Sequence, residues 1–476
     1  MLFSSMIFLW IFLPVVFIGY RLLGEKYRNL FLLLASIIFY GWGEPKNVIV
    51  MLVSILINYV CGIWIENFKD FRKKLFVTVC IVMNLGVLGY FKYMTPSYET
   101  LSQLLNLKYF YDGVALPIGI SFYTFQAISY VVDVYRGTIK AQRNLIDMGL
   151  YITFFPQLIA GPIVKYHDIE PQLKTRELTL QDTAYGFRRF IYGLAKKVLI
   201  ANNLAMISDD IFAIPGNALD TPAAWIGILA FNLQVYFDFS GYSDMAIGLG
   251  RMFGFRFMEN FNYPYISTSI REFWQRWNIS VFTWFREYLY FPLGGSRKGE
   301  FRTCLNIFIV FAATGIWHGA ALNYMFWGIY FGIVQILERL WLKHVMERPA
   351  VGAFFSKPFW LVPSHLYFLL VVLISSIFFK TQDLTHFAEY FKITFFWHDN
   401  PSLAAGDLIT GWGWGLCIIA ALLCGPLQTM IPALRKALYR EDKIYAVEVP
   451  FLLILLGVSI FCLSGSAYNP FIYFNF

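Results

Sequence analysis

His318 has a reactive side chain in an apolar segment, where a titratable group costs free energy to bury. It lies in TGIWHGA, at the end of an apolar run fit for lipid. A titratable group at membrane depth faces a protein interior or a water-filled cavity, and by default marks a functional site. Imidazole has an ordinary pKa of about 6.5, which suits proton transfer near neutral pH. We therefore predict His318 as a general base. The alternative is a ring that binds a neighbouring backbone carbonyl in a packed interior.

A polar and aromatic segment, REFWQRWNISVFTWFREYLYFPLGGSRKG, precedes His318 within residues 266–320. It contains Asn278, whose carboxamide does not titrate near neutrality. An amide can orient an imidazole, or donate a hydrogen bond to an oxygen on which negative charge develops. We predict Asn278 as the second catalytic residue, and Arg276, Trp277 and Trp317 as lining of the same cavity.

A second polar cluster occurs in DFSGYSDMAIG, which contains Asp238, Tyr242, Ser243 and Asp244. Paired carboxylates invite a metal site, but no histidine accompanies them, so we predict no metal here. Gly241 favours a helix break. The cluster is therefore predicted to line a polar cavity or to cap a helix.

The elements that must position these residues are membrane helices. Of the 476 residues, 58% are hydrophobic and 14% charged, against roughly 25% charged in soluble domains. The sequence predicts an all-α, polytopic integral membrane protein, one domain over residues 1–476, with ten to twelve membrane-embedded helices. Spans are predicted at about 2–20, 29–43, 47–65, 75–92, 225–251, 303–322, 325–342, 359–379, 408–430 and 447–465.

The net charge of +8 is explained by topology rather than by nucleic acid, since the cations fall between spans. Clusters follow the first and third spans, which places both loops in the cytoplasm and the N-terminus outside. The first segment lacks a basic n-region and a cleavage site, so it is expected to stay as a span. The six cysteines stand singly in apolar segments and are predicted to be free thiols.

Four further segments carry specific expectations. Residues 92–114 are predicted to be a loop, and the polar residues of 115–137 to face the protein interior. Residues 151–163, interrupted by proline and glycine, are predicted to be bent or re-entrant. Residues 187–198 form an apolar stripe opposite a basic face, which predicts an interfacial helix. Its cations would meet solvent or an anionic cofactor such as coenzyme A.

These motifs together resemble the membrane-bound O-acyltransferase superfamily. The resemblance rests on REFWQRWNIS, TWFREYLYFPLGGSRKG and GIWHGA, with ALPIGISFYTFQAISYVVDVYRG, FFPQLIAGPIVKYHDI and DFSGYSDMAIGLGRMFG. It is strongest to the bacterial branch that acetylates alginate, cellulose or peptidoglycan, and it covers the whole chain. It implies a ring of helices around a centre where a cytoplasmic tunnel meets an extracytoplasmic funnel.

The resemblance also assigns the site residues. The family's catalytic histidine corresponds to His318, and its second position to Asn278. Here the chain departs from the polysaccharide branch, in which a histidine is expected after the Arg-Trp pair. Asn278 instead matches the wider superfamily, including the sterol and ghrelin acyltransferases. A mechanism that needs two imidazoles is therefore not implied for this chain.

The implied activity is transfer of an acyl group, expected to be acetyl, from a cytoplasmic thioester to an extracytoplasmic hydroxyl. The donor would be acetyl-CoA or another acyl thioester, without a metal. The implied partners are the lipid bilayer, an extracytoplasmic SGNH-type acetyltransferase and a polysaccharide acceptor. The implied location is the bacterial cytoplasmic (inner) membrane. A lipid-directed acyltransferase is the alternative, and a transporter or flippase is disfavoured because no repeated halves are visible.

The C-terminal sequence SAYNPFIYFNF carries a separate resemblance. Phe471, Tyr473 and Phe476 match the Phe-x-Tyr-x-x-Phe tail of the small partner protein in teichoic-acid D-alanylation. The match implies that the phenol of Tyr473 is acylated and relays the group to the partner transferase. The alternative is an aromatic anchor at the membrane interface.

Overall fold

The computed structural model describes residues 1–105, 113–381, 383–398, 409, 411–438, 440–441, 448–465 and 468–471. Their regular structure is helical, and no strand occurs among them. Six helices in these residues are long and apolar enough to cross a membrane, which agrees with a polytopic all-α protein. They are Val48–Asn67, Asp70–Ser102, Leu180–Phe212, Glu300–His318, Pro358–Lys380 and Glu448–Gly465. The segments Phe8–Leu22 and Gly411–Leu423 are apolar but shorter.

The chain forms two compact units and passes between them several times. The first comprises Met1–Leu194, Tyr242–Glu259 and Glu441–Gly465. The second comprises Ala195–Gly241, Asn260–Arg440 and Ser466–Phe476. His318 and Asn278 both belong to the second unit, so its packing alone positions them.

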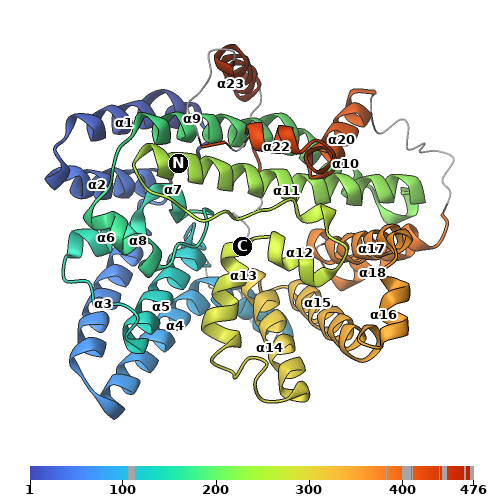
Figure 1. Ribbon diagram of the computed structural model, residues 1–476, viewed down its shortest axis with the longest axis horizontal. Helices are drawn as coiled ribbons and strands as arrows, with labels where there is room; N and C mark the ends of the chain where they lie inside the picture. Colours follow the sequence, from blue (N-terminus) through green and yellow to red (C-terminus); the bar gives the residue numbers. More distant parts are fainter. Residues whose placement is uncertain are drawn as a thin grey trace. The chain divides into compact units, whose positions relative to one another are not determined.

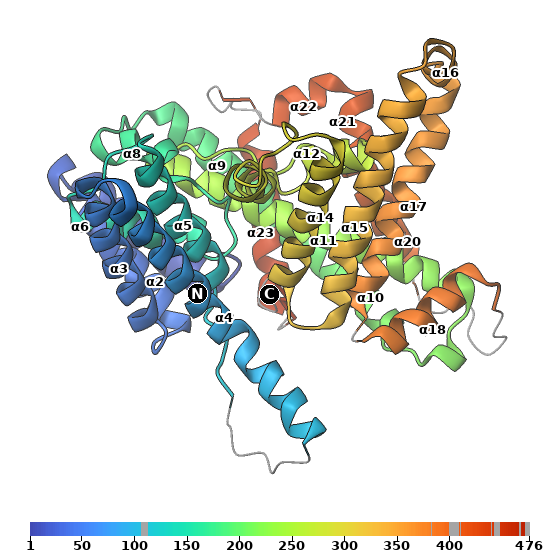
Figure 2. The same cartoon turned by 90° about the horizontal axis from the view of Figure 1, so that it is seen from below.

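The first unit is a group of helices built mainly from the N-terminal part of the chain, in which α3, α4 and α5 lie side by side (Figure 2). Its elements are η1 (Phe8–Phe12), α1 (Leu13–Leu22), α2 (Glu25–Gly43), α3 (Val48–Asn67), α4 (Asp70–Leu104), α5 (Ile120–Arg136), α6 (Leu145–Thr153), α7 (Phe155–Leu158), α8 (Tyr166–Lys174), α9 (Leu180–Ala195) and α23 (Glu448–Gly465). Helix α4 continues well past residue 92, so the loop predicted from there is wrong as far as Leu104.

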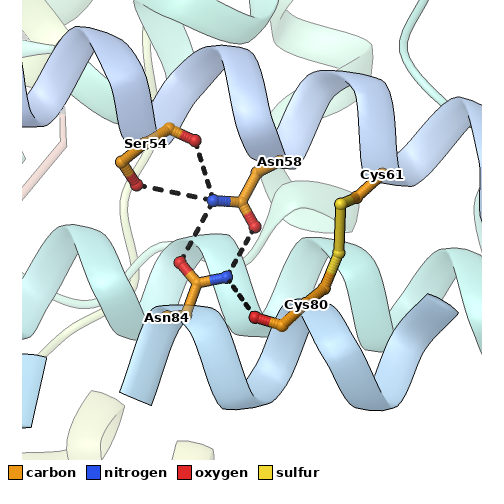
Figure 3. The surroundings of a disulfide bond; sticks show 5 residues. All are labelled: Ser54, Asn58, Cys61, Cys80 and Asn84. Atoms are coloured by element: carbon orange, nitrogen blue, oxygen red, sulfur yellow. Dashed lines mark hydrogen bonds between the residues drawn. A yellow bond between two sulfur atoms is a disulfide. The ribbon is translucent and has the colours of Figure 1, made fainter. Parts of the chain in front are cut away.

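A pair of hydrogen-bonded amides and a disulfide join α3 to α4 (Figure 3). Asn58 and Asn84 exchange amide hydrogen bonds, Nδ2 to Oδ1, of 3.1 and 2.8 Å. One turn away, Cys61 and Cys80 form a disulfide with a Cα–Cα distance of 6.7 Å. The prediction of free thiols is therefore wrong for these two. It treated each cysteine by its spacing along the chain, whereas the antiparallel packing of two neighbouring helices brings positions 61 and 80 together. Cys304, Cys417, Cys424 and Cys462 are free.

Helix α5 is buried on almost every side, as its polar residues predicted. Ser121, Thr124, Gln126 and Asp133 are all shielded from solvent. The helix starts after Gly119, whose φ of 76° lies in the left-handed region. A Cβ there would lie 2.6 Å from the carbonyl oxygen of Leu158, so the close approach of these segments requires glycine.

The bend predicted in residues 151–163 is confirmed. Helix α6 ends at Thr153 and α7 begins at Phe155, with proline in its first turn. Residues 148–163 are buried within the protein, where protein groups can satisfy an irregular backbone.

The basic helix near residues 187–198 is not interfacial, because its cations are buried against carboxylates. Arg189 pairs with Asp244 at 2.6 Å, and Arg188 pairs with Glu448 at 3.2 Å. Lys197 pairs with Asp238 at 2.7 Å. The prediction that these cations meet solvent or an anionic cofactor is therefore wrong. A basic stripe in a sequence shows only that the cations lie on one face of the helix. Here Asp244 and Asp238 of a facing helix pair with two of those cations.

That acidic helix is α11 (Thr221–Met252), which runs without interruption through Gly241. The predicted break is therefore wrong. A glycine costs about 1 kcal/mol of helix propensity, and the burial of residues 236–252 on all sides outweighs that small local cost.

The second unit contains the remaining helices, with α14, α15 and α17 packed as neighbours (Figure 1). Its elements besides the first part of α11 are η2 (Lys196–Ala201), α10 (Asn202–Phe212), η3 (Gly216–Ala218), η4 (Pro264–Ile266), α12 (Ile270–Arg276), α13 (Ile279–Phe285), η5 (Arg286–Tyr290), α14 (Glu300–His318), α15 (Leu322–Trp341), η6 (Leu342–Met346), α16 (Pro349–Phe355), η7 (Pro358–Trp360), α17 (Leu361–Lys380), α18 (Leu384–Phe395), α20 (Gly411–Leu423), α21 (Pro426–Met430) and α22 (Pro432–Leu438).

Helices α14 and α15 approach closely because glycines face each other. A Cβ on Gly328 would overlap the carbonyl oxygen of Phe311 and lie 2.9 Å from the Cα of Gly315. Small residues at such contacts are typical of membrane helices, where close backbone approach replaces the hydrophobic effect as the source of association. This hairpin fixes the position of His318 at the end of α14.

Candidate active site

The candidate site is a cavity of about 540 Å³ within the second unit. Its wall includes His318 and Asn278, together with the predicted Trp277 and Trp317. The cavity follows one face of α15 from Trp327 to Arg339 and on to Lys343 in η6. At about 1.5 Å rise per residue, the step from Trp327 to Arg339 alone extends it by about 18 Å. The site is thus elongated, with His318 near one end.

His318 is the last residue of α14, and its ring sits in an aromatic enclosure. The ring centroid lies 4.9 Å from that of Trp327, 5.2 Å from that of Phe379 and 4.6 Å from that of Trp317. The side chain is buried and faces the cavity rather than lipid.

Asn278 immediately precedes α13 and adopts a left-handed backbone conformation, with φ 43° and ψ 54°. Asn260 fixes the start of this helix: its carbonyl oxygen accepts from Ile279 N–H at 3.0 Å, and its Oδ1 accepts from Ser280 N–H at 3.1 Å. The side-chain amide of Asn278 lines the cavity. Its Oδ1 is buried and has no hydrogen-bond partner among the residues that the structure describes. A buried polar atom held in this way is costly, which is typical of a group kept for a ligand.

A further polar pair, Asn232 on α11 and Ser376 on α17, lines the cavity wall. The Ser376 hydroxyl donates to Asn232 Oδ1 at 2.8 Å, and Tyr265 donates to the Asn232 carbonyl oxygen at 2.9 Å. Phe379, one turn after Ser376, packs against His318. The pair therefore ties α11 to the helix that encloses the imidazole.

The opposite end of the cavity is cationic. Four basic side chains line it: Arg271, Arg286, Arg339 and Lys343. Lys343 pairs with Glu300 at 3.2 Å. Glu338, also in the wall, accepts instead from the backbone N–H groups of Ile270 and Arg271 at 2.8 and 2.9 Å. Among the described residues, no carboxylate forms an ion pair with the guanidinium of Arg271 or Arg339. Two cations are thus available to an anion.

Other predicted site residues lie elsewhere. Arg276 donates to Glu272 at 2.8–2.9 Å and to the Asn262 carbonyl oxygen at 3.1 Å, and is not among the cavity-lining residues. The α11 cluster is also absent from the wall of this cavity. Its members Tyr242, Ser243 and Asp244 belong to the first unit, and Asp238 is paired with Lys197.

Tyr473 and Phe476 lie outside the described residues. Phe471 is described and buried. Among the described residues, no group of three or more His, Cys, Asp or Glu is placed to hold a metal ion.

Several site residues were not predicted from the sequence. Arg339 lies near the end of the predicted span 325–342 and Lys343 directly follows that span, so both read as an ordinary basic flank. Asn232 lies six residues before Asp238, the first member of the polar cluster of α11, among mostly apolar neighbours. Periodicity offered one signal: Trp327, Phe331 and Gln335 recur every fourth residue, which places them on one face of α15.

Comparison with known proteins extends these observations. Residues 140–379 match MBOAT, the membrane-bound O-acyltransferase family. The chain is 38% identical to a probable alginate O-acetylase of Pseudomonas putida, covering 100% of both chains. It is 45% identical to a probable alginate O-acetylase of Azotobacter vinelandii over 71% of this chain and 69% of that one. It is also 36% identical to a peptidoglycan O-acetyltransferase of Helicobacter pylori over 71% of this chain and 70% of that one.

Proposed function

The chain belongs to the membrane-bound O-acyltransferase family, in its polysaccharide O-acetyltransferase branch, and from this premise we propose its reaction. It moves an acyl group, acetyl in the simplest case, from a cytoplasmic thioester to an extracytoplasmic hydroxyl, for modification of a cell-surface or exported polysaccharide. The observation that carries the proposal is the cavity that joins His318 and Asn278 at one end to Arg271 and Arg339 at the other, two guanidinium groups that form no ion pair with any described carboxylate.

His318 acts as the general base. It takes the proton of the acceptor hydroxyl as the oxygen attacks the thioester carbon, and it returns that proton to the thiolate after the C–S bond breaks. The aromatic rings around the imidazole exclude water. Exclusion of water protects the thioester from hydrolysis and strengthens the local electrostatics.

Asn278 stabilises the charge that develops during the attack. The thioester oxygen becomes negative in the transition state, and the Asn278 side-chain N–H can donate to it. Its buried Oδ1 can in turn accept from the imidazole. Either contact needs the amide to be held in place, which the Asn260 contacts to the start of α13 provide.

The cationic end fits the anionic part of the donor. Acetyl-CoA and carrier-protein thioesters both present a long, thin arm that bears phosphate at one end and the thioester at the other. A cavity that follows α15 for about 18 Å matches such an arm. Arg271 and Arg339 would bind the phosphate, because a guanidinium group pairs with phosphate through two parallel hydrogen bonds.

Charge asymmetry supports a cytoplasmic donor entrance. The turn from His318 to Asn323 carries no acidic or basic residue other than the imidazole, whereas the opposite end of the hairpin carries Arg339, Lys343 and Arg302. By the positive-inside bias that basic end faces the cytoplasm. The protein would then reside in the bacterial inner membrane and pass the acyl group outward to a polysaccharide, through an SGNH-type partner transferase.

The relay to that partner is assigned to Tyr473. Its phenol would attack the thioester, giving a tyrosyl ester and a free thiol, and the ester would then be transferred to a glycan hydroxyl with return of the phenol. Mass spectrometry of the C-terminal peptide after incubation with labelled donor tests this. An unlabelled peptide, or full glycan acetylation by Tyr473→Phe, would exclude the relay.

The base assignment is tested by His318→Ala, assayed in membranes with labelled acetyl-CoA and an acceptor. Acylation should vanish while the protein still inserts and purifies normally. His365→Ala is the matched control. That imidazole is also in the second unit, but its Nδ1 is 2.9 Å from the Ser267 carbonyl oxygen and it does not line the cavity. Turnover retained by His318→Ala would exclude the assignment.

Donor binding is tested by Arg339→Met, which keeps an unbranched apolar side chain and removes the guanidinium charge. The KM for the donor should rise about tenfold, the value of one charge-assisted contact of about 1.5 kcal/mol, with a smaller change in kcat. Arg297→Met is the control, because Arg297 is exposed and lies outside the cavity wall. Equal KM values for the two variants would refute the phosphate site.

A further inference from the structure

A buried ion pair outside the cavity contacts the end of the chain. Lys197 and Asp238 lie 2.7 Å apart, with side chains only 4% and 2% exposed. A buried pair of this kind costs several kcal/mol of desolvation per ion, and it persists only when further hydrogen bonds satisfy its atoms. The proposed proton transfer and donor binding use neither residue.

The C-terminal segment supplies those further contacts. The Lys197 ammonium donates to the carbonyl oxygen of Pro470 and lies 5.8 Å from the centroid of the Phe471 ring. Asn202 Nδ2 donates to Asn469 Oδ1 at 3.3 Å. Phe471 is itself 5% exposed. Lys197 thus contacts the carboxylate of Asp238 on one side and residues 470–471 on the other.

A second anchor lies earlier in the same segment. The Tyr468 hydroxyl donates to Asp209, and Lys380 donates to the other oxygen of that carboxylate. Lys380 directly follows Phe379, whose ring packs against His318. The segment 468–471 is therefore tied at both ends to residues of the second unit.

Both anchors adjoin the wall of the cavity. On α11, Phe231 and Val235 line the cavity. Asp238 follows on the same helical face at the next turn, a rise of about 4.5 Å beyond Val235. The other anchor is one residue from Phe379, which also lines the cavity.

We propose that Lys197 and Asp238 form a seat that holds the C-terminal segment against the cavity wall and thereby positions the last residues of the chain for acyl transfer. Lys197 is a positioning residue, since it acts through the tail rather than on substrate. The catalytic consequence rests on the proposed relay, whereas the seat itself does not.

Hydrogen exchange of the C-terminal peptide, measured on the full-length protein in detergent, tests the seat. Lys197→Met should speed exchange in the peptide that contains residues 468–471. The control is Lys392→Met, which removes an exposed lysine of α18 in the same unit and should leave exchange at the wild-type rate. Phe471→Ala provides a second arm that leaves the ion pair intact, and it should also speed exchange. Unchanged exchange in both test variants would overturn the proposal.

Activity assays separate the seat from the relay. In Lys197→Met, acyl transfer to the acceptor should fall about 10²-fold, as expected for a misplaced reacting group, while the affinity for acetyl-CoA stays at the wild-type value. Faster exchange together with an unlabelled Tyr473 in the wild-type protein would retain the seat and refute the relay. Loss of acetyl-CoA affinity together with transfer would overturn the positioning role.

Discussion

Replacement of Asn278 by glycine separates the two roles that this residue combines. Its φ of 43° places it in the left-handed region. There, alanine costs roughly 1–2 kcal/mol, whereas glycine pays no steric cost. Asn278→Ala therefore removes the amide and strains the backbone together. Asn278→Gly removes the amide alone, apart from about 0.5–1 kcal/mol of lost chain entropy.

The expected effect on catalysis is larger than either backbone term. Loss of one donor to a developing oxyanion costs about 2.7–4 kcal/mol, a decrease of 10²–10³-fold in kcat. We expect both variants to lose that much activity. Asn278→Ala should lose more thermal stability than Asn278→Gly, because only alanine is strained at this position.

The assay is single-turnover transfer from labelled acetyl-CoA, with thermal unfolding measured in the same detergent. Asn278→Asp is a useful third arm, because aspartate tolerates the left-handed conformation but has no N–H to donate. It should be as inactive as the glycine variant. If Asn278→Gly turned over at the wild-type rate, the residue would be a backbone element before α13 and the oxyanion argument would fail.

Two further predictions concern the scaffold. Gly328→Ala should destabilise the α14–α15 hairpin and lower activity despite the better helix propensity of alanine, because its Cβ would overlap a carbonyl oxygen. Gly332→Ala is the milder control, since its Cβ would lie 3.3 Å from the nearest side chain, and equal thermal stability of the two variants would contradict this packing. Thiol alkylation of the denatured, unreduced protein should leave Cys61 and Cys80 unmodified, and reduction should lower stability by about 3 kcal/mol for a loop of this length; modification of either cysteine before reduction would argue against the disulfide.

The fold class was predictable because it depends on composition and periodicity. Long apolar runs define α3, α14 and α17 within a few residues, since each must satisfy its backbone internally at membrane depth. The polar residues of α5 were correctly placed in the interior for the same reason. The extension of α4 past residue 92 was missed, because polar and aromatic residues there weaken the apolar signal without opposing a helix.

The site was predictable only where a residue type is itself unusual. A lone imidazole or a carboxamide amid aromatic residues stands out in the sequence, whereas Arg339 and Asn232 do not. The joining of Cys61 to Cys80, and of Lys197 to Asp238, depends on which helices become neighbours. No spacing along the chain contains that information.

The two polar clusters of the sequence differ in whether their polar groups already have partners within the protein. In α11 the charges of Asp238 and Asp244 are matched by Lys197 and Arg189 at 2.6–2.7 Å. Paired in this way they hold helices together, and they have little residual charge to offer a substrate. Around the cavity, by contrast, the amide oxygen of Asn278 has no hydrogen-bond partner among the described residues. No described carboxylate forms an ion pair with Arg271 or Arg339. The buried amide oxygen is costly to leave without a hydrogen bond, and a bound thioester would satisfy it, while the phosphate of the donor would pair with the two guanidinium groups. The difference between satisfied and unsatisfied polarity, rather than the number of polar residues, is the reason that we propose the second unit as the place of the reaction.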